Sequence, residues 1–123
     1  MKELAQVVPD AKVLLALEPE ELGAKLLFLI RKRPYSSVLL SNLENELWEG
    51  SHLHNQEPLY PAMHRGQISL ALREAWAWLE AQGLLIPEDG NNGRNGWRVL
   101  SRRARRFESQ AEFANEHRAF HFL

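Results

Sequence analysis

The sequence predicts a mainly α-helical domain with a small β-hairpin, followed by a C-terminal helix. Apolar residues recur at the three- and four-residue spacing of an amphipathic helix over several stretches. Two short apolar runs flank a loop rich in glycine and asparagine, which is a hairpin pattern. A length of 123 residues is sufficient for one domain with its own hydrophobic core.

The composition is that of a globular protein. Hydrophobic residues make up 45% and charged residues 25% of the chain, which are ordinary fractions. There is no cysteine, so neither a disulfide nor a thiolate metal site can stabilise the fold, and this fits a reducing compartment. The longest apolar run, LLFLI at 26–30, is too short to span a membrane, and the N-terminus lacks a signal-peptide pattern. We therefore expect a cytoplasmic protein without membrane contact.

Two helix starts are recognisable in the first part of the chain. The Pro-Asp pair at 9–10 precedes a short apolar helix that ends near Leu17. Pro19, followed by two glutamates, forms the first turn of a longer helix, because proline loses no hydrogen bond there and acids face the positive end of the dipole. Pro34 stops this helix after a basic triplet at 31–33. The triplet lies at the negative end of the dipole, which favours a structural role over ligand binding.

A short extended segment and a shorter helix are predicted next. Residues 36–40 form the extended segment. Ser41 and Glu44 have the spacing of a capping box, which predicts a helix from there to about Trp48. Residues 51–61 follow as a loop, bounded by glycine and containing two prolines.

The segment AWAWLEAQ at 75–82 contains two tryptophans that would share a face in a strand. The residues around them are strong helix formers. At 100° per residue, Trp76 and Trp78 flank the two edges of one apolar face, which is formed by Ile68, Ala71, Leu72, Ala75 and Leu79. Gly83 supplies the stop, so the predicted helix runs from Arg65 to Gln82. Both tryptophans are expected to pack in the core rather than stack on bases.

The last part of the chain predicts the hairpin and one more helix. Residues 84–87 and 97–101 are the two strands, and the loop EDGNNGRNG joins them. Pro87 restricts the first strand to an edge of the sheet or marks the end of that strand. A second capping box, Ser109 to Glu112, opens a helix with Phe113, His117 and Phe120 on one face.

This order of elements is that of a winged helix-turn-helix domain over residues 19–106. An N-terminal short helix and lead-in (1–18) precede it, and a C-terminal helical extension (107–123) follows. The long helix takes the position of the recognition helix, which enters the major groove in such domains. Residues 88–96 would form the tip of the wing.

The stretch EAWAWLEAQGLLIPEDGNNGRNGWRVLSRRARRF also resembles a family of uncharacterised bacterial and prophage proteins, the Ymh-type or abortive-infection-like proteins. The shared features are a tryptophan-rich helix, a Gly-Leu exit, a glycine loop, a strand that begins with tryptophan and an Arg-Arg stretch. The resemblance covers residues 14–123. It implies that longer relatives continue into a second, helical domain, and it assigns no catalytic residue.

The arginines indicate double-stranded DNA as a partner. The net charge is −1, so any attraction to nucleic acid depends on local clusters. Between positions 94 and 106 there are six arginines and no acid, which predicts an unpaired cationic patch. We expect phosphate contacts from Arg94, Arg98, Arg102 and Arg103. On the recognition-position helix, the residues expected to face the groove are Gln67, Ser69 and Arg73.

Two features favour a protein-interaction or dimerisation module instead, such as the N-terminal part of a phage-defence-like protein. The loop between the two helices of the helix-turn-helix is about ten residues, against three or four in the usual motif. The exposed side of the long helix carries Glu74 and Glu80, with Leu70, Ala77 and Ala81 between them. The apolar sequence at 119–123 also predicts packing of the C-terminal helix, on its own domain or in a homodimer.

Other chemistry is not indicated, and we expect no enzyme, no metal, no cofactor and no small-molecule substrate. His52 and His54 lack further ligands at a typical zinc spacing. His117 and His121 share a helix face with phenylalanines, which favours packing. The serines lack a nucleophile motif such as G-x-S-x-G. The glycine loop is not followed by the helix that a phosphate loop or a dinucleotide fingerprint requires.

Overall fold

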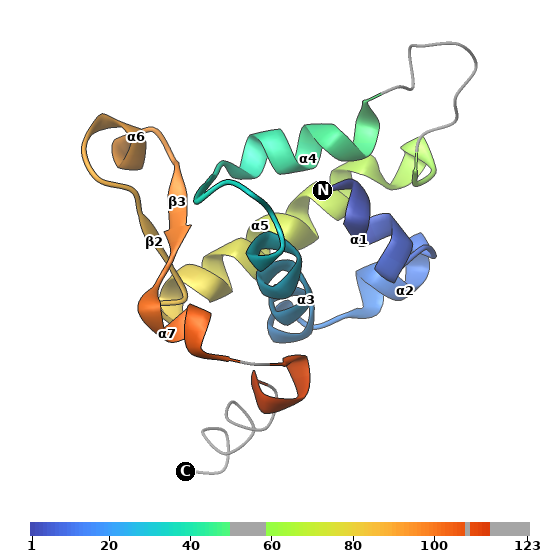
Figure 1. Ribbon diagram of the computed structural model, residues 1–123. Helices are drawn as coiled ribbons and strands as arrows, with labels where there is room; N and C mark the ends of the chain where they lie inside the picture. Colours follow the sequence, from blue (N-terminus) through green and yellow to red (C-terminus); the bar gives the residue numbers. More distant parts are fainter. Residues whose placement is uncertain (50–58, 108, 114–123) are drawn as a thin grey trace.

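The computed structural model describes residues 1–49, 59–107 and 109–113. This part of the chain is mostly helical, with one small antiparallel sheet (Figure 1). In chain order the elements are α1 (Lys2–Val7), α2 (Ala11–Ala16), α3 (Pro19–Arg31), β1 (Ser37–Val38), α4 (Leu40–Trp48), the 3-10 helix η1 (Ala62–His64), α5 (Arg65–Ala81), β2 (Leu85–Pro87), α6 (Asn91–Arg94), β3 (Arg98–Leu100) and α7 (Arg102–Arg106).

The long helices α3 and α5 pack against each other and form the centre of the core. α3 begins at Pro19, as predicted, and the backbone N–H of Glu18 donates to the Glu21 carboxylate at 3.0 Å. Gly23 lies where the helices come closest, because a Cβ at this position would be 2.9 Å from the Trp78 ring. Because glycine has no side chain, the Trp78 ring can pack directly against the backbone of α3.

The prediction for α5 is confirmed to within one residue at its C-terminal end. The apolar face is buried as expected, through Ile68, Leu72, Ala75 and Leu79. Trp76 is 6% exposed, and Trp78 is partly buried and packed against the core. The chain leaves the helix through Gly83, whose positive φ of 68° only glycine adopts without strain.

The N-terminal region contains one helix more than the sequence indicated. The predicted short helix is α2, and the Asp10 carboxylate caps it by accepting from the Lys12 N–H at 2.8 Å. The additional helix, α1, has only six residues and no side-chain cap. Such a helix is not stable alone, so its formation depends on burial of Met1 and Leu4 against α3 and α4.

The capping box predicted at Ser41 is wrong. α4 begins one residue earlier, at Leu40, and Leu39 is its N-cap without a side-chain hydrogen bond. The preceding strand sets this start, because Val38 pairs with β3 and Leu39 remains extended. Glu44, the expected partner of Ser41, instead accepts a hydrogen bond from Ser69 of α5 at 3.1 Å.

The predicted hairpin is confirmed, and the extended segment near 36–40 adds a third strand to it. The strand order is β1-β3-β2, all antiparallel, with Leu85 opposite Leu100 and Ser37 opposite Val99. Pro87 ends the edge strand β2, as expected. The tip of the hairpin holds a short helix, α6, rather than an open loop.

The residues after the hairpin form helix α7 instead of continuing the strand. The Ser101 hydroxyl caps it, accepting from the Ala104 N–H at 3.1 Å. Further on, Ser109 accepts from the Glu112 N–H at 3.1 Å, as the second capping box predicted. Phe113 is buried edge-on against three aromatic rings, those of Phe28, Trp78 and Phe107.

Other predictions fall wholly or partly beyond the described residues. The start of the predicted C-terminal helix packs on its own domain through Phe113. The rest of that helix, with His117, Phe120 and His121, lies outside the described residues, as do His52 and His54. At the end of the predicted loop, Tyr60 is buried and its hydroxyl donates to the Val8 carbonyl at 2.6 Å.

Candidate nucleic-acid interface

The three residues expected to face a DNA groove have different environments on α5. Gln67 and Arg73 are exposed. Ser69 is partly buried, and its hydroxyl donates to Oε1 of Glu44 at 3.1 Å, which links α5 to α4. Two of the three side chains are therefore accessible to a partner, and the third holds the two helices together.

Arg98 is committed to contacts inside the domain. Its Nε lies 3.1 Å from Oε1 of Glu80 on α5, and its Nη1 donates to the carbonyls of Gly93 and Trp97 at 3.0 Å. The side chain is only 18% exposed. Arg98 thus fastens the hairpin to α5. The expectation that the arginine cluster has no internal carboxylate partner is wrong at this position, because the fold brings Glu80 beside β3.

Arg103 and Arg31 bind backbone carbonyls. Nη1 of Arg103 donates to the Gln82 carbonyl at 2.8 Å, at the C-terminal end of α5. The Arg31 guanidinium donates to the carbonyls of Phe107 and, at 3.4 Å, of Arg105, and it lies 5.1 Å from the centre of the Phe28 ring. These two arginines attach α7 and the chain after it to the helical core.

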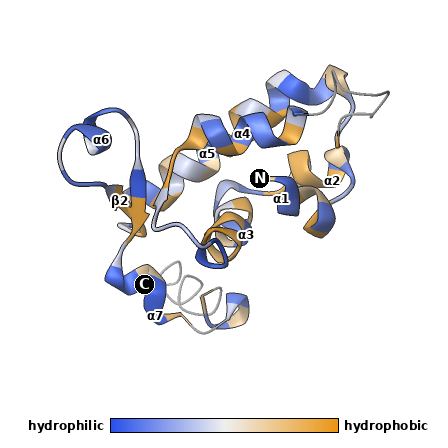
Figure 2. Cartoon of the chain, turned by 45° about the horizontal axis from the view of Figure 1, so that its top comes forward, coloured by the Kyte–Doolittle hydropathy of each residue, from blue (hydrophilic) through white to orange (hydrophobic). Residues whose placement is uncertain are grey.

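Of the six arginines between positions 94 and 106, four remain exposed: Arg94, Arg102, Arg105 and Arg106. Within the described part of the chain, no side-chain hydrogen bond or ion pair is found for any of them. The first lies in α6 and the others in α7, and both views place these helices on the same side of the molecule as the sheet (Figures 1 and 2). We call these four residues the flank arginines.

The flank arginines differ from the predicted phosphate-contacting set. Arg94 and Arg102 belong to both sets, whereas Arg105 and Arg106 were not selected from the sequence. The sequence signal that could have indicated helix α7 was Ser101, because serine is a common N-cap residue and here caps the helix. The short helix α7 buries Ala104 and leaves Arg102, Arg105 and Arg106 exposed. An extended strand would instead place alternate residues on opposite sides.

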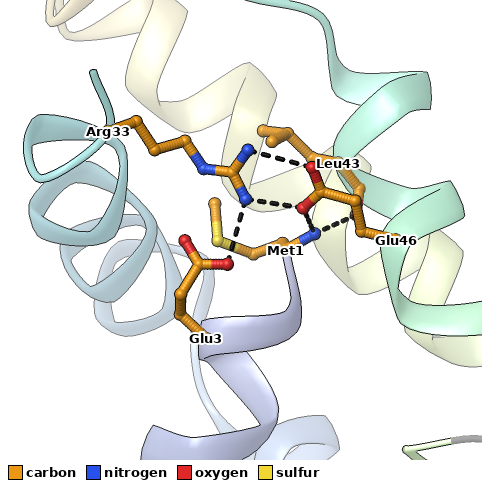
Figure 3. A network of polar contacts seen from close by, with 5 residues as sticks. All are labelled: Met1, Glu3, Arg33, Leu43 and Glu46. Atoms are coloured by element: carbon orange, nitrogen blue, oxygen red, sulfur yellow. Dashed lines mark hydrogen bonds and ion pairs between the residues drawn. The ribbon is translucent and has the colours of Figure 1, made fainter. Parts of the chain in front are cut away.

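A separate network of charges joins α1, α3 and α4 (Figure 3). Glu46 accepts from Nη1 of Arg33 at 2.9 Å and from Nη2 at 2.5 Å, and the Met1 ammonium group pairs with the same carboxylate. Glu3 accepts from Arg33 at 3.0 Å. The hydrogen bonds from Arg33 are the largest cause that lowers the pKa of Glu46 to about 2, and they outweigh burial, which acts in the opposite direction.

The pKa values of Arg33 and of the Met1 amino group are shifted as well. Hydrogen bonding to Glu46 is the main cause that raises the pKa of Arg33. Burial lowers the pKa of the Met1 amino group although it is paired with Glu46, because it is almost completely removed from water. Arg31 and Arg33 of the basic triplet both make hydrogen bonds within the domain.

Two hollows lie beside the turn between α3 and β1. The larger, of about 620 Å³, is bounded by β1, α4 and Trp97, and Glu46 is among its lining residues. The smaller, of about 140 Å³, lies between the turn, Leu100 and α7. Among the described residues, its polar lining consists of Arg31, Arg33, Tyr35, Ser36 and Arg105, and none of the described lining residues is acidic.

The described residues contain no group of three or more histidine, aspartate or glutamate side chains that could hold a metal ion. Over the same residues, no helix is long and apolar enough to cross a membrane.

The fold and these side chains define a class: a mostly helical domain with a small three-stranded antiparallel sheet and an arginine-rich flank. No model of a protein family, no curated protein and no solved structure matches the chain. The resemblance to Ymh-type proteins, and the function that it would imply, therefore stay predictions.

Proposed function

We propose that this chain is a cytoplasmic winged helix-turn-helix domain that binds double-stranded DNA mainly through phosphate contacts. Apart from the 3-10 helix η1 and the short helix α6 at the hairpin tip, the order from α3 to β3 is helix, strand, helix, helix, strand, strand, and the first strand pairs with the last. This order and pairing support the assignment. α5 takes the position of the recognition helix, and the hairpin β2–β3 takes that of the wing.

The flank arginines are the observation that carries this proposal. They are exposed, the helices α6 and α7 that carry them lie on one side of the molecule, and the described residues offer them no carboxylate partner. A guanidinium group on such a surface binds phosphate oxygens with charge-assisted hydrogen bonds and displaces condensed counterions from the duplex. A domain with a net charge of −1 can therefore bind DNA through this side alone.

We expect little sequence preference. Base edges are distinguished by paired donors and acceptors in the major groove, and few exposed side chains of α5, among them Gln67 and Arg73, offer these. Leu70 and Glu74 are also exposed there, and neither attracts the duplex. Arg98 contributes indirectly in this proposal, because its ion pair with Glu80 fixes the wing against α5.

The salt dependence of binding to a labelled duplex tests the proposal. If the four flank arginines each contact one phosphate, log K should fall with log salt concentration with a slope of about −3.6, at about −0.9 per contact. Arg102→Gln and Arg106→Gln should each reduce that slope by about 0.9. Lys12→Gln is the matched control, because this exposed cation lies on α2, away from the flank. Absence of binding at about 50 mM salt and micromolar protein would refute DNA binding.

A second candidate function, a protein-interaction or dimerisation module, is favoured by one observation. Met63 is 83% exposed and Leu70 is 49% exposed, one on η1 and the other two helical turns further along α5. We take these two exposed apolar side chains as the contact surface of such a module, which would overlap the part of α5 that would meet DNA. Sedimentation equilibrium tests it: Leu70→Glu should dissociate an oligomer that uses this surface, while Arg106→Gln should leave the oligomer intact.

A further inference from the structure

The smaller hollow beside the α3–β1 turn has the size and lining of an anion site. Its volume of about 140 Å³ has room for a group of several atoms, since about 10–15 Å³ of such volume suffices for one water molecule. Its walls come from three separate parts of the chain: the end of α3 with the following turn, β3 at Leu100, and α7 at Arg105. The hollow is thus a product of the tertiary fold.

The charge around this hollow is positive and uncompensated. Arg33 is already neutralised by Glu46 and Glu3. Arg31 and Arg105 have no ion pair with any acid in the described part of the chain. Two net positive charges therefore line a space in which the described residues place no acid, which suits a phosphate group carrying close to two negative charges.

Unused hydrogen-bond donors are also present. The Nε of Arg33 is buried and has no hydrogen-bond partner. Nη1 and Nη2 of Arg31 each donate to one carbonyl, and a guanidinium has five N–H groups in all. Buried donors are nearly always paired in folded proteins, and the Arg33 side chain lines both this hollow and the larger one. The Ser36 hydroxyl lines the same space and can donate as well.

We propose that this hollow binds a phosphate group, held by Arg31, Arg33, Ser36 and Arg105. The ligand is either free orthophosphate or the terminal phosphate of a nucleic acid, since both present the same three acceptor oxygens. The larger hollow is a poorer candidate, because Glu46 lines it and would repel an anion. The C-terminal end of α3, which carries the negative end of the helix dipole, lies beside the hollow and would disfavour an anion. Its effect is reduced because the carbonyls of Leu29 and Ile30 accept hydrogen bonds from the N–H groups of Lys32 and Arg33.

The site goes beyond the proposed duplex contact and shares only Arg105 with it. The flank arginines do not include Arg31 or Arg33, and Ser36 also lies outside the flank. The flank arginine Arg106 does not line the hollow. Failure of one proposal can therefore be told apart from failure of the other. Arg106→Gln should weaken duplex binding without changing phosphate binding, whereas Arg105→Gln should weaken both.

The test is a titration of the ¹⁵N-labelled protein with sodium phosphate at constant ionic strength, balanced with sodium chloride. We expect saturable shifts of the Ser36 amide and of the Arg33 Nε–H signal, with a Kd on the order of 1 mM. Arg105→Gln and Ser36→Ala should each weaken phosphate binding about fivefold or more, as the loss of a charge-assisted or hydroxyl hydrogen bond requires. Both side chains are exposed, so we expect each variant to fold. The dispersion of its spectrum will show whether it does.

Arg106→Gln is the matched control, because it removes a neighbouring charge on α7 that does not line the hollow. The same titration with a short oligonucleotide, with and without a 5′-phosphate, separates the two sources of the group. Tighter binding only with the 5′-phosphate assigns the site to a nucleic-acid end, and equal binding of the two oligonucleotides assigns it to free phosphate. Shifts that do not saturate, or equal phosphate affinity in wild type, Arg105→Gln and Ser36→Ala, would overturn the proposal.

Discussion

Glu46→Gln should destabilise the protein through the network shown in Figure 3. The carboxylate joins Arg33, in the turn after α3, to the Met1 ammonium group, and it is only 26% exposed. The glutamine amide keeps the shape but loses the charge, so Met1 and Arg33 face each other with only Glu3 nearby. An ammonium group that is almost completely buried is then left without its carboxylate.

The magnitude follows from the pKa of Glu46, which is lowered from 4.5 to about 2. Since a tenfold change in proton affinity corresponds to about 1.36 kcal/mol, the network stabilises the folded state by roughly 3 kcal/mol when Glu46 is ionised. The folded pKa lies below the unfolded one. This contribution is therefore fully present above about pH 4.5 and is lost as the pH falls toward 2.

Urea denaturation at several pH values between 6 and 2 measures this. At pH 6 the free energy of unfolding of Glu46→Gln should be lower than that of wild type by about 2–3 kcal/mol, and the difference should shrink as the pH falls toward 2. Glu74→Gln is the matched control, because this exposed glutamate on α5 has no ion pair within the described residues. A Glu46→Gln variant within about 0.5 kcal/mol of wild type at pH 6, or a difference that is constant with pH, would refute the reasoning.

Three further predictions concern the core and the hairpin. Trp76→Ala removes a buried ring from the edge of the α5 apolar face and should cost about 3–5 kcal/mol in urea denaturation; a loss below about 1 kcal/mol would contradict core packing. Gly93→Ala should destabilise the hairpin tip, because a Cβ there would be 1.9 Å from the Glu88 carbonyl oxygen, and an unchanged melting temperature would argue against this close approach. Arg98→Gln loses the ion pair with Glu80 and should raise amide exchange across residues 85–100 about tenfold, while exchange in α3 stays as in wild type.

Local sequence signals determined the long helices and the hairpin of this protein. Pro19 with two following glutamates starts α3, and Gly83, with its positive φ, ends α5. These residues act on the backbone of their own helix end, so their effect does not depend on distant parts of the chain. The spacing of apolar residues fixed which face of α5 is buried. The glycine- and asparagine-rich loop determined where the chain reverses between β2 and β3.

Only the tertiary structure decided what the charged side chains do. In the sequence Arg98 looks like Arg102, yet the placement of β3 on α5 pairs Arg98 with Glu80 and leaves Arg102 exposed. Arg31 likewise finds its acceptors more than seventy positions away, at Arg105 and Phe107. Helix α1 and the start of α4 also depend on partners distant in the chain. Periodicity and caps act within a few residues, whereas an ion pair depends on which surfaces meet after folding, and this only the packed structure defines.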